Sequence, residues 1–206
     1  MSTIKIIYFD LDGGRAEPIR LALSIANTEF EDKRISFPEF GELKSTLPLG
    51  AVPVAEIDGE TYTQCNALNR YFGKQAGLYP DDAWQAFLCD EVMDIIEDAS
   101  NAMGKTMGLQ GDALKAAREE LASGKLASIL RLLNKRLEDA GSEYFADSKL
   151  TMADLKMLEL LGTLTSGFFD HIPTDIVQKQ APLLVTHMQK VMSDQGVSAY
   201  YQKRSQ

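Results

Sequence analysis

The apolar positions of residues 1–77 alternate between strand spacing and helix spacing. Residues 4–9 form a run rich in β-branched side chains that predicts a strand. Residues 17–26 carry apolar side chains on one helical face, and Pro18 lies in the first turn, which predicts a helix. A second strand is predicted at 30–35, followed by a short irregular or helical piece at 37–46. This stretch therefore predicts the order strand, helix, strand, short helix.

Residues 51–67 predict a β-hairpin that leads directly into a helix. Strand formers precede Asp58-Gly59, a strong signal for a two-residue turn, and residues 60–63 return as the partner strand. The helix is expected to start at about Cys65, where the first backbone N–H groups have no partner within the helix. A carboxylate ligand would suit this position.

The complete order of the first half, βαβαββα, predicts a thioredoxin-like α/β domain with a mixed sheet over residues 1–79. Turn formers at 77–82 mark a boundary, and only helical spacing follows, so an all-α domain is predicted over residues 83–206. In that domain Thr151 and Asp154 have the spacing of a helix cap, in which each side chain satisfies a backbone N–H group.

Charge excludes one class of partner. The net charge is −9, and the chain does not show the clustered Lys and Arg residues that nucleic acid binding requires. An acidic surface also repels small anions, so an anionic ligand would need local cations. The candidates all lie in the first quarter of the chain: Arg15, Arg20, Lys33, Arg34 and Lys44.

The remaining composition indicates a cytoplasmic protein without a metal site. No apolar run is long enough to span a membrane, and no secretory leader is visible. Cys65 and Cys89 lack metal-type spacing and are expected to be free thiols. His171 and His187 have no neighbouring cysteine or paired acid, so we interpret them as surface or core histidines.

A series of short motifs follows the chain through both halves. In order they are Tyr8-Phe9, Gly14-Arg15-Ala16-Glu17-Pro18-Ile19-Arg20, Lys44, Pro48-Leu49-Gly50, Val52-Pro53-Val54, Asp58-Gly59, Gln64-Cys65-Asn66-Ala67, Arg70-Tyr71 and Leu150-Thr151-Met152-Ala153-Asp154. Their order and spacing resemble those of the cytosolic glutathione transferases. The resemblance is strongest to the sigma-like class, which includes prostaglandin D synthases and S-crystallins.

The resemblance implies a tyrosine-type glutathione transferase. Tyr8 matches the tyrosine that donates its O–H to the sulfur of glutathione, and Arg15 matches the neighbouring arginine that supports the thiolate. Glutathione would be a co-substrate, and a hydrophobic electrophile would be the second substrate, in a pocket to which the helical domain contributes.

The same resemblance implies how glutathione is held. Lys44 matches a lysine that pairs with the glycine carboxylate, and Phe40 stands beside it where tryptophan is common. Val52 matches the residue whose backbone pairs with the cysteinyl part, with Pro53 in the cis isomer. The pair that binds the γ-glutamyl end is matched by Gln64 and Cys65.

The family forms homodimers, which implies one contribution from the partner subunit. Asp98 is the candidate for the residue that reaches the γ-glutamyl amine bound by the neighbouring subunit, with Glu97 or Asp94 as alternatives. Leu49 stands where some classes carry an aromatic key for dimer formation, so that type of contact is not expected.

Three departures leave alternatives open. Cys65 replaces the usual serine, Phe40 the usual tryptophan, and Ala51 a residue that is often glutamine or lysine, so the affinity for glutathione is expected to be modest. The alternatives are a glutathione-dependent isomerase like prostaglandin D synthase, and a non-catalytic relative like the S-crystallins. A mixed disulfide between Cys65 and glutathione is a further, weaker hypothesis.

Overall fold

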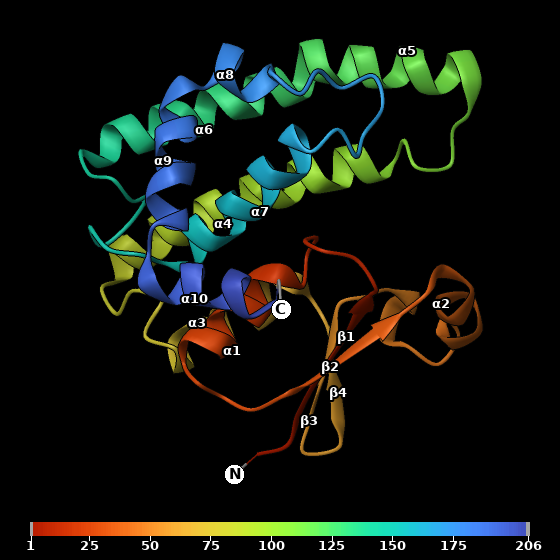
Figure 1. Ribbon diagram of the computed structural model, residues 1–206, viewed down its shortest axis with the longest axis vertical. Helices are drawn as coiled ribbons and strands as arrows, with labels where there is room; N and C mark the ends of the chain where they lie inside the picture. The colour runs from red at the N-terminus through yellow and green to blue at the C-terminus, as the bar shows by residue number, and fades with distance from the viewer. Residues whose placement is uncertain (1, 205–206) are drawn as a thin grey trace. The chain divides into compact units, whose positions relative to one another are not determined.

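The computed structural model describes residues 2–204, which divide into two compact units. The first unit comprises residues 2–79 and helix α10. Its elements are β1 (Ile4–Phe9), α1 (Glu17–Ile25), β2 (Glu31–Ile35), α2 (Phe37–Leu43), the 3₁₀ turn η1 (Pro48–Gly50), β3 (Val54–Ile57), β4 (Glu60–Tyr62), α3 (Cys65–Gln75) and α10 (Gln195–Arg204) (Figure 1). The second unit spans residues 80–194 and is entirely helical.

The first unit contains a mixed sheet with the strand order β2-β1-β3-β4. β1 pairs with β2 in parallel, with Tyr8 opposite Arg34, and with β3 in antiparallel orientation. The β3–β4 hairpin turns at Asp58 and Gly59, whose φ angles of 52° and 88° fit the tight turn that this dipeptide predicts. The α/β class and the mixed sheet are therefore confirmed.

Alternating residues of β1 face two different cores. Ile6 and Tyr8 pack with Ile19 of α1 and Phe72 of α3, so these helices cover one face of the sheet. Ile7 packs on the other face, among apolar side chains that include Phe40 and Leu43 of α2. The period of two along the strand thus places Tyr8 on the α1–α3 face, at the end of the central strand β1.

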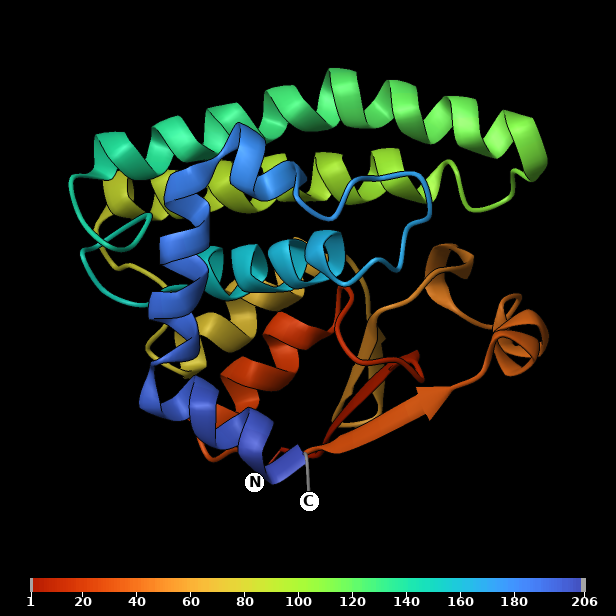
Figure 2. The same ribbon diagram turned by 45° about the horizontal axis from the view of Figure 1, so that its top comes forward.

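The second unit is helical throughout, and most residues of its helix α7 are buried (Figure 2). Its elements are α4 (Ala83–Gly104), α5 (Gly111–Leu121), the π-helical segment η2 (Ala122–Leu126), α6 (Ala127–Ala140), α7 (Met152–Thr165), α8 (Ile176–Gln180) and α9 (Pro182–Met192). The helix cap predicted at Thr151 is present: its N–H and hydroxyl both donate to Asp154 Oδ2 at 2.7 Å.

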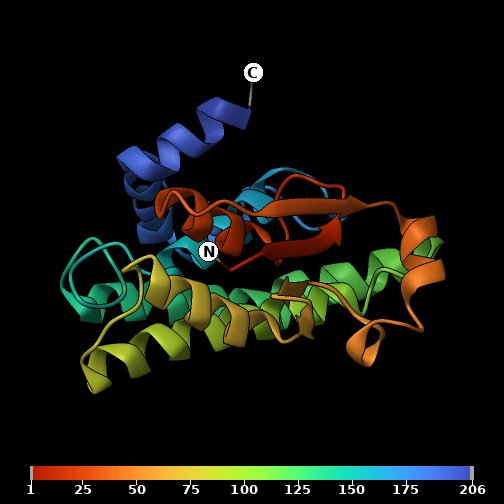
Figure 3. The same ribbon diagram turned by 90° about the horizontal axis from the view of Figure 1, so that it is seen from below.

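The last helix departs from the predicted division of the chain. Residues 195–204 were assigned to the helical domain of 83–206, but α10 packs on α1 and groups with the first unit (Figure 3). Its side chains reach the start of α1, where Arg204 Nη1 donates to Glu17 Oε1 at 2.5 Å. Helical spacing predicts that these residues form a helix, but it does not specify the surface that the helix covers.

Candidate active site

Tyr8 lies where the sequence places it, at the end of β1, with 6% of its surface exposed. Its hydroxyl oxygen accepts a hydrogen bond of 3.1 Å from the backbone N–H of Arg15. The predicted catalytic pair is therefore in direct contact, through the backbone of Arg15. Accepting this bond polarises the phenol and strengthens it as a donor.

The loop between β1 and α1 brings the backbone close to the Tyr8 ring. Gly13 and Gly14 have φ angles of +100° and +71°, which side chains other than glycine rarely adopt. A Cβ atom on Gly14 would lie 2.7 Å from Tyr8 Cε1 and 2.8 Å from its hydroxyl oxygen. Glycine at position 14 is thus required both by backbone angle and by the close approach to Tyr8.

The start of α3 meets the same loop from the other side. Cys65 Sγ donates to the carbonyl oxygen of Arg15 at 3.4 Å and accepts from Asn69 Nδ2 at 3.6 Å. Arg15 therefore links the two predicted sites through its backbone, its N–H bonded to Tyr8 and its C=O bonded to Cys65. The Cys65 thiol uses its proton inside the protein, so it is a poorer ligand donor than the usual serine.

Gln64 precedes α3 with an unusual backbone. Its φ and ψ angles are 78° and 102°, in a region that non-glycine residues rarely occupy, and its side chain is exposed. Such strain is concentrated at ligand-binding positions, where the surrounding structure holds it. No feature of the sequence predicts this backbone conformation, although the residue itself was a candidate.

The remaining candidates of the first unit fall into two segments. The Val52-Pro53 peptide bond is cis, as predicted, and lies directly before β3. On α2 the Phe40 ring packs edge-on against Phe9 with centroids 5.1 Å apart, and the Phe9 ring in turn contacts Tyr8 at 5.4 Å.

Lys44 follows α2 and is exposed. Its side chain lies beside Gly50, where an added Cβ atom would come within 3.2 Å of Lys44 Cγ. The structure thus brings Phe40 toward the Tyr8 end of the sheet through Phe9 and leaves the Lys44 side chain accessible to solvent.

Asp98 belongs to the other unit, on the exposed side of α4. Its carboxylate is 67% exposed and lies 3.4 Å from Lys125 Nζ. Of its two alternatives, Glu97 pairs with the buried ammonium of Lys156 at 2.7 Å, whereas Asp94 is exposed. Glu97 thus has a structural role, which leaves Asp98 and Asp94 as the accessible carboxylates of this part of α4.

Both histidines have the roles expected of surface or core residues. His171 is exposed, whereas His187 is buried, with Nδ1 2.9 Å from the carbonyl oxygen of Glu143 and Nε2 3.5 Å from Asp154. Burial raises the pKa of Asp154, and His187 and Thr151 partly offset this effect. Within residues 2–204, no group of three or more His, Cys, Asp or Glu side chains could hold a metal ion.

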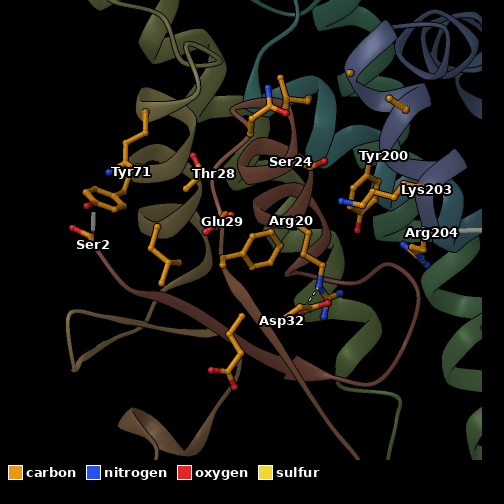
Figure 4. A pocket seen from close by; sticks show the side chains of 18 of the residues that line it. Ser2, Arg20, Ser24, Thr28, Glu29, Asp32, Tyr71, Tyr200, Lys203 and Arg204 are labelled. Carbon is orange, nitrogen blue, oxygen red and sulfur yellow. Dashed lines mark hydrogen bonds and ion pairs between the residues drawn. The ribbon is translucent and has the colours of Figure 1, made fainter.

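A large open groove of about 2040 Å³ lies elsewhere on the first unit (Figure 4). It runs along α1, β2, α3 and α10, and none of the candidate site residues lines it. Arg20 and Arg34, two of the five candidate cations, do line it, and each donates to the Asp32 carboxylate at 2.9 Å. These two arginines are therefore engaged in ion pairs of the protein itself.

Comparisons with known proteins identify the family of the chain. The model of the glutathione S-transferase N-terminal domain matches residues 4–74, and that of the C-terminal domain matches residues 97–204. Glutathione S-transferase 3 of Caenorhabditis elegans is 33% identical over 85% of this chain and 87% of its own length. The thioredoxin-like sheet with an attached helical unit defines the class, and the chain belongs to the glutathione S-transferase family.

Solved structures resemble the complete chain. The structure of prostaglandin synthase D of Nilaparvata lugens has a TM-score of 0.86 and 30% sequence identity, covering 98% of both chains. A monomeric glutathione S-transferase of the hookworm Necator americanus has a TM-score of 0.84 and 26% identity, covering 98% of this chain and 97% of its own. Among the described helices, none is both long and apolar enough to cross a membrane.

Proposed function

We propose that this protein conjugates the thiolate of reduced glutathione to hydrophobic electrophiles, with Tyr8 as the residue that stabilises the thiolate. The observation that carries the proposal is the hydrogen bond from Arg15 N–H to the Tyr8 hydroxyl oxygen, because it strengthens the phenol as a donor. A phenol that is supported in this way can donate a hydrogen bond to a thiolate beside it and stabilise the negative charge on the sulfur.

Thiolate stabilisation alone gives a small acceleration. A thiol with a pKa near ~8.5 is about 3% ionised at pH 7, and lowering the pKa by ~2 units raises the thiolate fraction about 25-fold. Nucleophilicity falls with pKa, which offsets nearly tenfold of this gain. The larger part of the rate must come from holding thiolate and electrophile together.

The proposed glutathione site follows the geometry of the first unit. The γ-glutamyl carboxylate would lie at the start of α3, beside Gln64 and the backbone N–H groups that follow it. Val52 would pair with the cysteinyl backbone, and Lys44 with the glycine carboxylate. Because the Cys65 proton is bonded to Arg15, we expect the helix N–H groups to supply most of the binding at the γ-glutamyl end.

The finer assignments are proposals as well. We place the protein in the sigma-like class, which the likeness to prostaglandin synthase D of Nilaparvata lugens supports. We also propose that it is a cytoplasmic homodimer in which Asp98 reaches the glutathione of the partner subunit. The helical unit would supply residues that hold the electrophile, while product analysis would distinguish conjugation from isomerisation.

The test is the conjugation of glutathione to a chlorodinitrobenzene-type electrophile across a pH series. We expect Tyr8→Phe to lower kcat/KM at pH 7 about threefold, the net gain that remains once the lower nucleophilicity of the stabilised thiolate is counted. The acid limb of its pH profile should move up toward the pKa of free glutathione. The exposed Tyr71→Phe is the matched control and should behave as the wild type.

Two results would contradict the proposal. A wild type that does not exceed the uncatalysed rate would exclude conjugation and favour the isomerase or the structural alternative. A Tyr8→Phe variant with the wild-type rate and pH profile would remove Tyr8 from its role while leaving the family assignment intact.

A further inference from the structure

Two arginines from distant parts of the chain hold the loop that carries Arg15. Arg34 of β2 donates to the carbonyl oxygen of Leu11 at 3.4 Å, and its Nη1 lies 3.6 Å from the Asp10 carboxylate and 3.4 Å from that of Asp12. The second arginine, Arg204 of α10, forms an ion pair with Asp12 from its Nη2. The 10–15 loop is therefore held at its tip by both arginines.

Arg204 also holds the first residue of α1. Its Nη1 donates to Glu17 Oε1 at 2.5 Å, across 187 positions of sequence, and only 1% of the Glu17 side chain is exposed. The guanidinium carbon lies 5.9 Å and 5.8 Å from the ring centroids of Tyr200 and Tyr201 (Figure 4 shows Tyr200 beside it). One planar side chain thus bridges the loop and the start of the helix with its two terminal nitrogens.

The segment between these two anchors is the one that contacts Tyr8. Glu17 N–H donates to the carbonyl oxygen of Gly14 at 2.9 Å, so the position of Glu17 sets that of Gly14. Gly14 lies directly against the Tyr8 ring, and the next residue gives its N–H to the Tyr8 hydroxyl. A shift of Glu17 or Asp12 would therefore change the distance between Arg15 N and the Tyr8 oxygen.

We propose that Arg204 is a positioning residue for the conjugation reaction: by pairing with Asp12 and Glu17 it fixes the 10–15 loop so that Arg15 N–H meets the Tyr8 hydroxyl. The inference rests on the proposed function, in which Tyr8 stabilises the thiolate. It assigns to α10 a role in the chemistry of the first unit that acts through the 10–15 loop.

The two ion pairs contribute unequally. The Asp12 carboxylate is 76% exposed, and a pair of this kind is weakened by solvent. The Glu17 carboxylate is buried, and its other cation, Arg20, is 3.4 Å away, so removing Arg204 leaves this charge poorly compensated. We therefore expect Glu17, and the start of α1 with it, to move most when Arg204 is removed.

The experiment compares the pH profiles of the wild type, Tyr8→Phe and three variants of α10 in the same conjugation assay. Arg204→Ala should lower kcat/KM at pH 7 by up to the same few-fold as Tyr8→Phe, because it acts through Tyr8, and should shift the acid limb upward in the same direction. Arg204→Lys keeps the charge but cannot bridge both carboxylates. Its acid limb should therefore lie between those of the wild type and Arg204→Ala. The matched control is Lys203→Ala, an exposed neighbour on α10 that should keep the wild-type profile.

Each outcome supports the inference or overturns it. A folded Arg204→Ala with the wild-type pH profile overturns it, even if its stability is reduced, because a merely structural role would not alter the thiolate. If Arg204→Ala does not fold, Arg204→Lys decides by the same criterion. Tyr8→Phe measured in parallel separates the two levels: a shift in Tyr8→Phe without a shift in the Arg204 variants leaves the proposed function standing and removes only the role of Arg204.

Discussion

At the scale of single residues, backbone groups connect the candidate side chains to one another. Tyr8 and Cys65 meet through the N–H and C=O of the same residue, Arg15. The family resemblance predicts the roles of all three residues, because each of them matches a position in a sequence motif. It does not predict the backbone bonds between them, since those depend on how the loop and α3 meet in the folded chain.

The same limit explains the other residue-level differences. Gly14 was part of a predicted motif, but its close approach to the Tyr8 ring is visible only in three dimensions. Arg20 and Arg34 were candidate cations for an anionic ligand, and each of them is bonded to Asp32 instead. Charge in a sequence indicates that a partner is needed, but it does not show whether the partner is a ligand or another part of the protein.

The two cysteines should differ strongly in reactivity. Burial raises the pKa of Cys89 to about 12, so that about one molecule in ten thousand carries this thiolate at pH 8, and its side chain is inaccessible. Cys65 is half-buried at the proposed glutathione site. We expect one thiol of the native protein to react with an aromatic disulfide reagent, and both thiols to react after unfolding.

The control for this labelling also tests the binding site. Cys65→Ser should abolish the native reaction and leave only the thiol that unfolding exposes. S-methylglutathione, which has no free thiol to consume the reagent, should slow the labelling of Cys65. Unchanged labelling at a saturating concentration of this compound would place the γ-glutamyl end away from α3.

At the scale of elements, prediction succeeds where the pattern is local. The Asp58-Gly59 turn fixes the β3–β4 hairpin, and β1 has the predicted bounds Ile4–Phe9. Other ends shift by one to three residues; β3, for example, begins at Val54, after Pro53, which has no N–H for the sheet. The pattern does not specify where α10 packs, because its contact between Arg204 and Glu17 spans 187 positions.

Two adjacent carboxylates of α4 should have opposite roles. Glu97 pairs with Lys156 of α7, an ammonium that is only 2% exposed, so Glu97→Ala removes an ion-pair partner of a buried charge. We expect the free energy of unfolding to fall by about 3 kcal/mol, the lower end of the range for a broken buried pair, because the Glu97 side chain is 23% exposed. The exposed Asp98→Ala should leave stability nearly unchanged and raise the KM for glutathione, if Asp98 reaches the partner's ligand as proposed.

Chemical denaturation and steady-state kinetics on the same two variants check this prediction. A loss of stability in Asp98→Ala would show that the pair with Lys125 matters more than its exposure indicates. A Glu97→Ala variant as stable as the wild type would mean that Lys156 finds another acceptor or loses its proton.

At the scale of the whole molecule, the proposed homodimer is a decisive question, because the related hookworm structure is of a monomer. Trp84 and Phe87 of α4 stack with ring centroids 5.2 Å apart and are 61% and 51% exposed, a pair that a partner chain would cover. We expect the protein to sediment as a species of twice the chain mass of 22.8 kDa. The Trp84→Ala variant should form this dimer more weakly. Phe168→Ala, also exposed, is the control and should not weaken the association.

Trp84 supplies a second measurement, since it is the only tryptophan of the chain. Dilution below the dissociation constant should make its fluorescence easier to quench with acrylamide. A single species of one chain mass at micromolar concentration would contradict the dimer, and with it the role of Asp98 in a neighbouring site.

The discontinuous first unit has a consequence for synthesis on the ribosome. Residues 2–79 emerge first, but α10 follows only after the 115 residues from 80 to 194, which at about 5–20 residues per second takes roughly 6–23 s. During that interval the nascent sheet and its helices exist without Arg204, and the Glu17 carboxylate remains without its second cation. The proposed active site would therefore reach its final geometry only when the last helix leaves the ribosome.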